Sequence, residues 1–288
     1  MFDLKKPINQ LALMLFLLGM GIILASVAIA FVPQNNDLQN VNMLRISQMM
    51  VQLLTFFVPS MLLIYFTNRQ APLYPTLLWN LSWKNVGWVL LLFLVSMPLM
   101  EKIIAWNEAL TLPQSMKAIE EWMRMQENEM TALTDKMIQA TSVPELLLNI
   151  LVMAIVPAIC EELLFRGVLQ NWLAQLISNK HVVIWLTAII FSAIHIQFFG
   201  FVPRMLLGAL LGYLFVWTKS IWVNIFAHFL NNALSVVSVY VCYLTHQDYK
   251  EASFLPSWWS LSLLLTIGVI FLVYRSTHKS CEVVSTDN

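Results

Sequence analysis

The sequence predicts an all-α, polytopic membrane protein with about eight transmembrane helices. Of its 288 residues, 59% are hydrophobic and only 11% are charged, whereas a soluble domain carries about 25% charged residues. A helix that crosses a bilayer needs about 20 mostly apolar residues, and the chain contains several such runs. We expect residues 1–288 to form a single integral membrane domain.

The apolar runs place the expected helices along the chain. The first run follows MFDLKKPINQ and is longer than the apolar region of a signal peptide, and it lacks a clear small-residue cleavage site. We therefore expect it to remain as the first span. The expected spans are about 10–32, 46–66, 86–104, 144–171, 182–199, 201–217, 221–244 and 257–274.

Two segments between the spans have a different character. Residues 74–85 are too short and too polar to cross a bilayer, and Trp79 and Trp83 favour a helix at the level of the lipid headgroups. Residues 105–143 form the large hydrophilic region, with good helix formers and apolar residues at helical spacing. This pattern predicts one or two amphipathic helices in an extracytoplasmic loop, most often a solvated cover.

The lysines and arginines of the short connections predict the orientation. Eight spans put both chain ends on one side of the membrane, and basic residues favour the cytoplasmic side. On the other side the short loops hold only Arg45, Arg204 and Lys250. We therefore expect both termini to be cytoplasmic, in what we take to be a bacterial cytoplasmic membrane. The side with the termini collects Lys5, Lys6, Arg69, Lys84, Lys180, Lys219, Arg275 and Lys279.

Three of the expected spans carry ionisable or amide side chains, which are costly in a bilayer and usually mark function. At a rise of about 1.5 Å per residue, these groups come to similar depth in or near the inner half of the bilayer. The agreement favours one shared site, opening toward the cytoplasm or laterally within the inner half of the membrane, over scattered polar residues. The residues are Glu161, Glu162 and Arg166 in the fourth span, His195 in the fifth, and His228 and Asn232 in the seventh.

Helical spacing suggests how these side chains divide their roles. Glu162 and Arg166 are four residues apart, so they share a helix face and can form an ion pair. Glu161 points about 100° away from Glu162, lacks that partner, and is the better candidate for a general base. His228 and Asn232 are also four residues apart and can together donate hydrogen bonds to an oxyanion. Phe191 shares a face with His195 and can form a wall beside it.

The three motifs resemble the CPBP family, the CAAX proteases and bacteriocin-processing intramembrane proteases, also called Abi proteins. EELLFR at 161–166 matches EExxxR, FSAIH at 191–195 matches FxxxH, and HFLNN at 228–232 contains HxxxN. EExxxR alone would be a weak signal, but the three motifs occur in order and inside expected spans. The resemblance covers about residues 144–244, which we take as the catalytic core helices.

The resemblance implies a fold of about eight helices and hydrolysis of a peptide bond within the membrane. By motif position, Glu161 and His195 would activate a water, and His228 and Asn232 would form the oxyanion hole. Glu162 and Arg166 would support the site. The implied partners are a peptide or membrane-protein substrate and the lipid bilayer, and membership in the family does not guarantee catalysis.

Other functions compete with a glutamate-activated water. A metalloprotease would use Glu161, His195 and His228 as ligands to zinc, but HExxH is absent and a carboxylate base needs no metal, so we expect no cofactor. A transporter or a non-catalytic immunity or scaffold protein would use the same groups as a proton relay, although we find no inverted repeat. Cys160 is expected to be an inert apolar cysteine. No basic patch suggests nucleic acid, and the sequence identifies no substrate.

Overall fold

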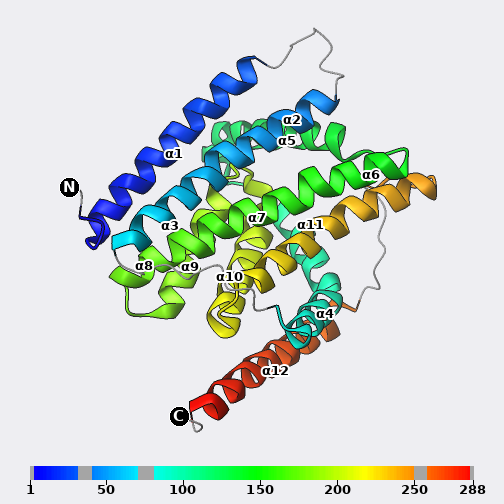
Figure 1. Cartoon of the computed structure of the whole chain (residues 1–288). Helices are drawn as coiled ribbons and strands as arrows, with labels where there is room; N and C mark the ends of the chain where they lie inside the picture. Colours follow the sequence, from blue (N-terminus) through cyan, green and yellow to red (C-terminus); the bar gives the residue numbers. More distant parts are fainter. Residues whose placement is uncertain (1–2, 32–40, 71–80, 250–257, 286–288) are drawn as a thin grey trace.

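The computed structural model describes residues 3–31, 41–70, 81–249 and 258–285, with side chains to residue 277. The described part is helical throughout, without strands (Figure 1). Seven of its helical segments are long and apolar enough to cross a membrane. The expected class, an all-α polytopic membrane protein, is confirmed. The interfacial helix expected at 74–85 lies largely outside the described residues, and Trp83 is instead the first residue of α4.

The first spans flank the bundle. Helix α1 lies beside a long second span that is built from two α-helices and a π-helical turn between them (Figure 1). On another flank, α4 packs against α12. Their bounds are α1 (Pro7–Ala30), α2 (Val41–Val51), η1 (Gln52–Phe57), α3 (Val58–Gln70), α4 (Trp83–Glu108) and α12 (Trp259–Ser285).

The central span contains two further π-helical turns. It runs through five consecutive segments from Val143 to Leu176 without a break in the helix. A π-turn adds a residue to one turn of helix and redirects the side chains around it, and such turns are frequent at functional sites. The segments are α6 (Val143–Ile150), η3 (Leu151–Ile155), α7 (Val156–Glu162), η4 (Leu163–Leu169) and α8 (Gln170–Leu176).

The span expected at about 182–199 is shorter than the sequence suggested. Helix α9 covers Lys180–Ala193, which is 14 residues, and at about 1.5 Å per residue it is too short to cross a bilayer alone. The chain leaves the helix at Ile196, whose φ of 53° is left-handed. A short 3₁₀ turn, η5 (Phe198–Gly200), leads directly into α10 (Phe201–Thr218), and α11 (Ile221–Leu244) follows. Helices α9 and α10 therefore form a hairpin with His195 in its connection.

The hydrophilic region folds as the sequence predicted. A 3₁₀ turn, η2 (Gln114–Met116), precedes one amphipathic helix, α5 (Lys117–Ile138). Near its end, Tyr249 donates a hydrogen bond to Asp135. Burial raises the pKa of Tyr249, and this hydrogen bond raises it further. Helix α5 is therefore fastened to the segment that follows α11.

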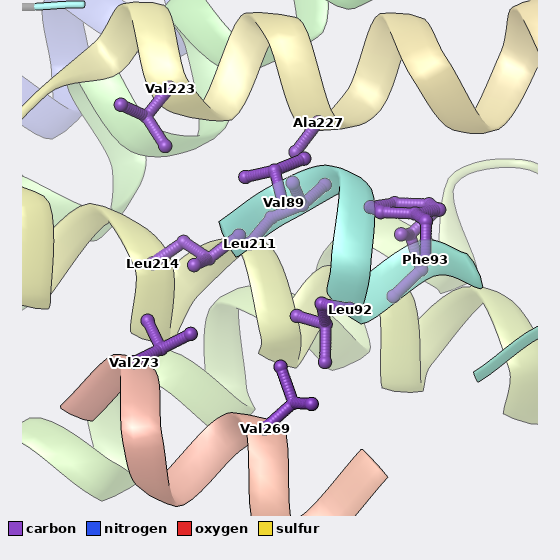
Figure 2. Close-up of a cluster of buried hydrophobic side chains, with 10 residues drawn as sticks. Val89, Leu92, Phe93, Leu211, Leu214, Val223, Ala227, Val269 and Val273 are labelled. Carbon is purple, nitrogen blue, oxygen red and sulfur yellow. The ribbon is translucent and has the colours of Figure 1, made fainter. Parts of the chain in front are cut away.

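One hydrophobic cluster joins α4, α10, α11 and α12 (Figure 2). Its side chains interdigitate between the four helices, so the two helices that line the site, α10 and α11, are held against a rigid layer. Ser262 of α12 adds a polar contact, because it accepts a hydrogen bond from the Leu99 N–H, 3.1 Å away, just beyond Pro98 of α4. The cluster consists of Val89, Leu92, Phe93, Leu207, Leu211, Leu214, Val223, Ala227, Val269 and Val273.

Glycine sets the distance between α1 and the π-turn η1. A Cβ atom added to Gly21 would lie only 2.3 Å from the carbonyl oxygen of Leu54 and 3.0 Å from Cα of Thr55. Both are backbone atoms that cannot move aside without displacing η1. Glycine at position 21 therefore allows the two backbones to touch.

We predict that Gly21→Ala destabilises the protein, because the new methyl group forces α1 and η1 apart. Gly19→Ala is the matched control in the same helix, since nothing lies within 4 Å of a Cβ at that position. Alanine is favoured over glycine inside a helix by about 0.8–1 kcal/mol, so the control should melt at or above the wild-type temperature. The melting temperatures of both variants can be compared in the same lipid. Equal melting temperatures would contradict the assignment.

Candidate active site

The two adjacent glutamates of the central span lie at the junction of α7 and η4, and both are buried. Glu162 is 0% exposed and Glu161 is 6% exposed. Successive residues of a helix point about 100° apart, so the carboxylates enter different surroundings. The structure therefore distinguishes them by their partners.

Glu162 has three partners from two segments. The guanidinium Nη1 of Arg166 donates to its Oε1 at 2.6 Å, and Nδ1 of His228 donates to the same oxygen at 2.9 Å. The side-chain amide of Asn224 donates to Oε2 at 3.4 Å. The Glu162–Arg166 pair expected from their spacing is thus present, and Glu162 also orients His228 of α11.

Arg166 links this cluster to a further helix. It is 0% exposed, and its Nη2 donates to the carbonyl oxygen of Gly208 in α10 at 2.7 Å. Its guanidinium carbon also lies 5.2 Å from the ring centroid of Phe191. One buried cation therefore fixes the relative positions of η4, α9 and α10.

Glu161 has no arginine bonded to it, but it is less free than its spacing suggested. The amide Nε2 of Gln52, in η1, donates to Oε1 of Glu161 at 3.1 Å. The other oxygen, Oε2, lies 3.8 Å from Nε2 of His228. Glu161 is thus a buried carboxylate with one neutral donor and a histidine nearby.

His228 stands between the two glutamates. Its Nδ1 faces Glu162 and its Nε2 faces Glu161, and the residue is 3% exposed. Because a carboxylate oxygen only accepts hydrogen bonds, the contact with Glu162 fixes a proton on Nδ1. Nε2 is therefore the ring atom directed toward Glu161.

His195 lies in the connection between α9 and η5, two residues past the end of the helix. Its Nδ1 is 2.8 Å from the carbonyl oxygen of Phe191, so Nδ1 is the donor. In a neutral ring this leaves Nε2 as an acceptor. The contact with Phe191 thus uses Nδ1 and leaves Nε2 for chemistry, which is a typical arrangement for a functional histidine.

Phe191 forms the wall that its spacing predicted, and it does so for both histidines. Its ring centroid lies 5.3 Å from that of His195 and 5.9 Å from that of His228. Both pairs are edge-to-face, which is a favourable geometry for aromatic rings. A single buried ring therefore brings the histidines of two separate helices to one site.

Asn232 lies one turn after His228 on α11 and is partly exposed. The neighbouring Asn231 donates to its Oδ1 at 3.1 Å. Since the oxygen of Asn232 is engaged, its NH₂ group is the part left to act as a donor.

The amphipathic helix α5 holds the connection that carries His195. Glu127 accepts a hydrogen bond from the Phe199 N–H at 3.1 Å, and Arg124 lies 4.2 Å from the Phe199 ring centroid. From α4, Asn107 accepts from the Val202 N–H at 2.8 Å. Residues after His195 are therefore held by α5 and by the end of α4, and both sets of contacts come from the hydrophilic region 105–143.

Two residues at the site escaped the sequence analysis. Gln52 and Gly208 each bond a predicted site residue. Gln52 had a signal, because an amide in the apolar run VQLLTFFV is as unusual as the polar groups that were singled out. Gly208 had none, since it contributes only a backbone carbonyl.

No group of three or more His, Cys, Asp or Glu side chains among the described residues is arranged to hold a metal ion. Cys160 is buried beside Glu161 on α7 and is a free thiol.

Comparison with known proteins points to one family. Residues 143–234 match the model described as Rce1-like, type II CAAX prenyl endopeptidase, and this range contains all three motifs. The match agrees with the resemblance of this segment to the CPBP family. A relative, YpbD of Bacillus subtilis (strain 168), is 27% identical over 123 residues, which are 41% of this chain and 56% of YpbD. The chain thus spans about half the length of this curated relative, and no solved structure matches it.

The CPBP segment includes Glu161, His195, His228 and Asn232 but leaves out the first three spans. Gln52 therefore reaches Glu161 from outside the segment that carries the family signature.

We predict that Arg166→Ala destabilises the protein, because it leaves Glu162 as a buried charge without its cation. Removing one partner of a buried ion pair costs about 3–5 kcal/mol. Arg69→Ala is the control, since Arg69 is exposed and contacts Tyr65 within its own helix. The folded yield and melting temperature should fall for Arg166→Ala alone. A variant that melts like wild type but is inactive would assign Arg166 to the chemistry instead.

Proposed function

We propose that this protein is an intramembrane endopeptidase that hydrolyses a peptide bond with a water activated by Glu161 and His195. The observation that carries the proposal is the separation of the two glutamates. Arg166 and His228 both bond Glu162, whereas Glu161 accepts a hydrogen bond from the neutral amide of Gln52 and has Nε2 of His228 3.8 Å from its other oxygen. The resemblance of this segment to the CPBP family supports the same reading.

In the proposed reaction, Glu161 takes a proton from the attacking water. His195 is suited to assist, because its Nδ1 bond to Phe191 leaves Nε2 free to accept. The water oxygen adds to the peptide carbonyl and forms a tetrahedral intermediate. The proton held by Glu161 then passes to the leaving amine as the C–N bond breaks, which regenerates the carboxylate.

The intermediate carries a negative oxygen that needs donors. We propose that Nε2 of His228, in the imidazolium form, and the NH₂ group of Asn232 supply them. Glu162 bonds Nδ1 of His228 and Asn231 bonds Oδ1 of Asn232, so each candidate donor is held by its other atom. Arg166 and Phe191 are then supporting residues that position His228 and Glu162.

The substrate class follows from the location of the site. Glu161, His228 and Asn232 lie on helices that are apolar enough to cross a membrane, so the substrate is a membrane protein or a membrane-bound peptide. The family description, a CAAX prenyl endopeptidase, makes a prenylated C-terminal peptide the first substrate to test.

We predict that Glu161→Gln loses at least about 10²–10⁴-fold in turnover, the range for general-base assistance, while its melting temperature stays near wild type. The assay uses purified protein in lipid and a fluorescent peptide ending in a farnesylated CAAX motif. Glu129→Gln, on the exposed face of α5, is the control for the charge change. Near-normal turnover by Glu161→Gln would show that Glu161 is not the general base.

The proposed mechanism requires no metal, because the carboxylate and the two donors supply the base and the oxyanion contacts. We therefore predict that turnover of the same peptide persists after dialysis against a strong chelator. Activity that disappears and is restored by zinc alone would instead support a metalloprotease with Glu161, His195 and His228 as ligands.

We also propose that both termini face the cytoplasm, as the basic residues of the short connections favour. In a background without native cysteines, Lys219→Cys should react with an impermeant maleimide only from the cytoplasmic side. Glu129→Cys, on α5, should react only from the opposite side. Both positions are exposed, and reversed labelling of the pair would invert the topology.

A further inference from the structure

The polar group that reaches the site from the second span is Gln52. It is 6% exposed and lies at the start of the π-turn η1, in the second span. A buried amide in a bilayer is costly unless it is hydrogen-bonded. Its Nε2 meets that requirement by donating to Oε1 of Glu161 at 3.1 Å.

The donor in this contact follows from the ionised form of Glu161 that the proposed function requires. A carboxylate oxygen cannot donate, so the amide nitrogen, not its oxygen, must face Glu161. The amide oxygen of Gln52 has no hydrogen-bond partner among the described protein groups. The side chain is therefore used for its N–H group alone.

The position of Gln52 is fixed by the helices on either side of η1. On one side α7, which carries Glu161, packs against η1. On the other side α1 touches the backbone of η1 at Gly21, where a Cβ would lie 2.3 Å from the Leu54 carbonyl oxygen. Gln52 thus lies on a turn that is held between two helices, and this fixed position allows it to orient another side chain.

We propose that Gln52 is a positioning residue for Glu161, holding one carboxylate oxygen so that the other faces the reacting water. This proposal rests on the proposed function of Glu161 and extends it to a residue outside the CPBP segment. It assigns Gln52 no contact with the substrate. Gln52 is neutral. The charged or titratable groups around Glu161 are Cys160, Glu162, Arg166, His195, Arg204 and His228.

The physical effect of the contact is to stabilise the ionised carboxylate. A hydrogen bond donated to a carboxylate favours its charged form, and a base must be charged to accept a proton. Without the donor, Glu161 would be free to rotate and would hold its own proton more readily. A purely structural amide would produce neither effect.

The test replaces Gln52 by methionine, which has nearly the same length but no donor. Gln48→Met is the matched control, one helical turn away in the same span. With the farnesylated CAAX peptide, Gln52→Met should lower kcat about 10- to 100-fold, the effect of losing a hydrogen bond to a charged group. KM should change by less than about twofold, and the acidic limb of the kcat profile should move to higher pH.

A second measurement needs no turnover. Dicyclohexylcarbodiimide modifies buried carboxyl groups only in their protonated form, and mass spectrometry of the peptide identifies which glutamate has reacted. Glu161 should be modified faster in Gln52→Met than in wild type or Gln48→Met, with the reaction persisting to higher pH. Glu162, which keeps Arg166 and His228, should react equally in all three proteins.

The two measurements separate this proposal from the proposed function. If Glu161→Gln abolishes turnover while Gln52→Met matches Gln48→Met in kcat, pH profile and carbodiimide reactivity, Gln52 has no positioning role and the base assignment stands. If Glu161→Gln remains active, the proposed function fails, and carbodiimide reactivity still decides whether Gln52 controls Glu161. A melting temperature that falls without change in either readout would make Gln52 structural only and overturn the proposal.

Discussion

The site depends on the compensation of one buried charge, the carboxylate of Glu162. This side chain is fully shielded from solvent, and leaving such a buried charge without its partner costs about 3–5 kcal/mol. Arg166, His228 and Asn224 all donate to it, and they come from η4 and α11. Arg166 then bonds the Gly208 carbonyl of α10. Satisfying Glu162 therefore brings the central span, α10 and α11 to fixed relative positions.

This arrangement explains how two adjacent glutamates acquire different environments. The helix turns by about 100° between them, so Arg166, which neutralises Glu162, does not bond Glu161. Glu161 instead faces Gln52, and His228 approaches it with the ring nitrogen that Glu162 does not use. Other parts of the structure support the site indirectly. Gly21 lets α1 support η1, and α5 holds the residues after His195.

The sequence predicted most of the fold because apolar length is a direct signature of a membrane span. It also predicted the Glu162–Arg166 pair and the Phe191–His195 contact, since both follow from a spacing of four residues on one helix. It misplaced the end of α9, because Ile194 and Ile196 continue the apolar pattern through a turn. It missed the bonds of Glu162 to His228 and of Glu161 to Gln52. Contacts between helices that are far apart in the sequence produce no regular spacing between residues that could predict them.

The central claim is that Glu162 maintains the structure while Glu161 is available for chemistry. Thermal unfolding of Glu162→Gln and Glu161→Gln, measured side by side in the same lipid, tests this most directly, because the substitutions are identical and the positions adjacent. Neutralising Glu162 leaves Arg166 as a buried cation without a counter-charge, so that variant should melt well below wild type, whereas Glu161→Gln should melt close to it. Equal losses in the two variants, or an unchanged melting temperature for Glu162→Gln, would contradict the account.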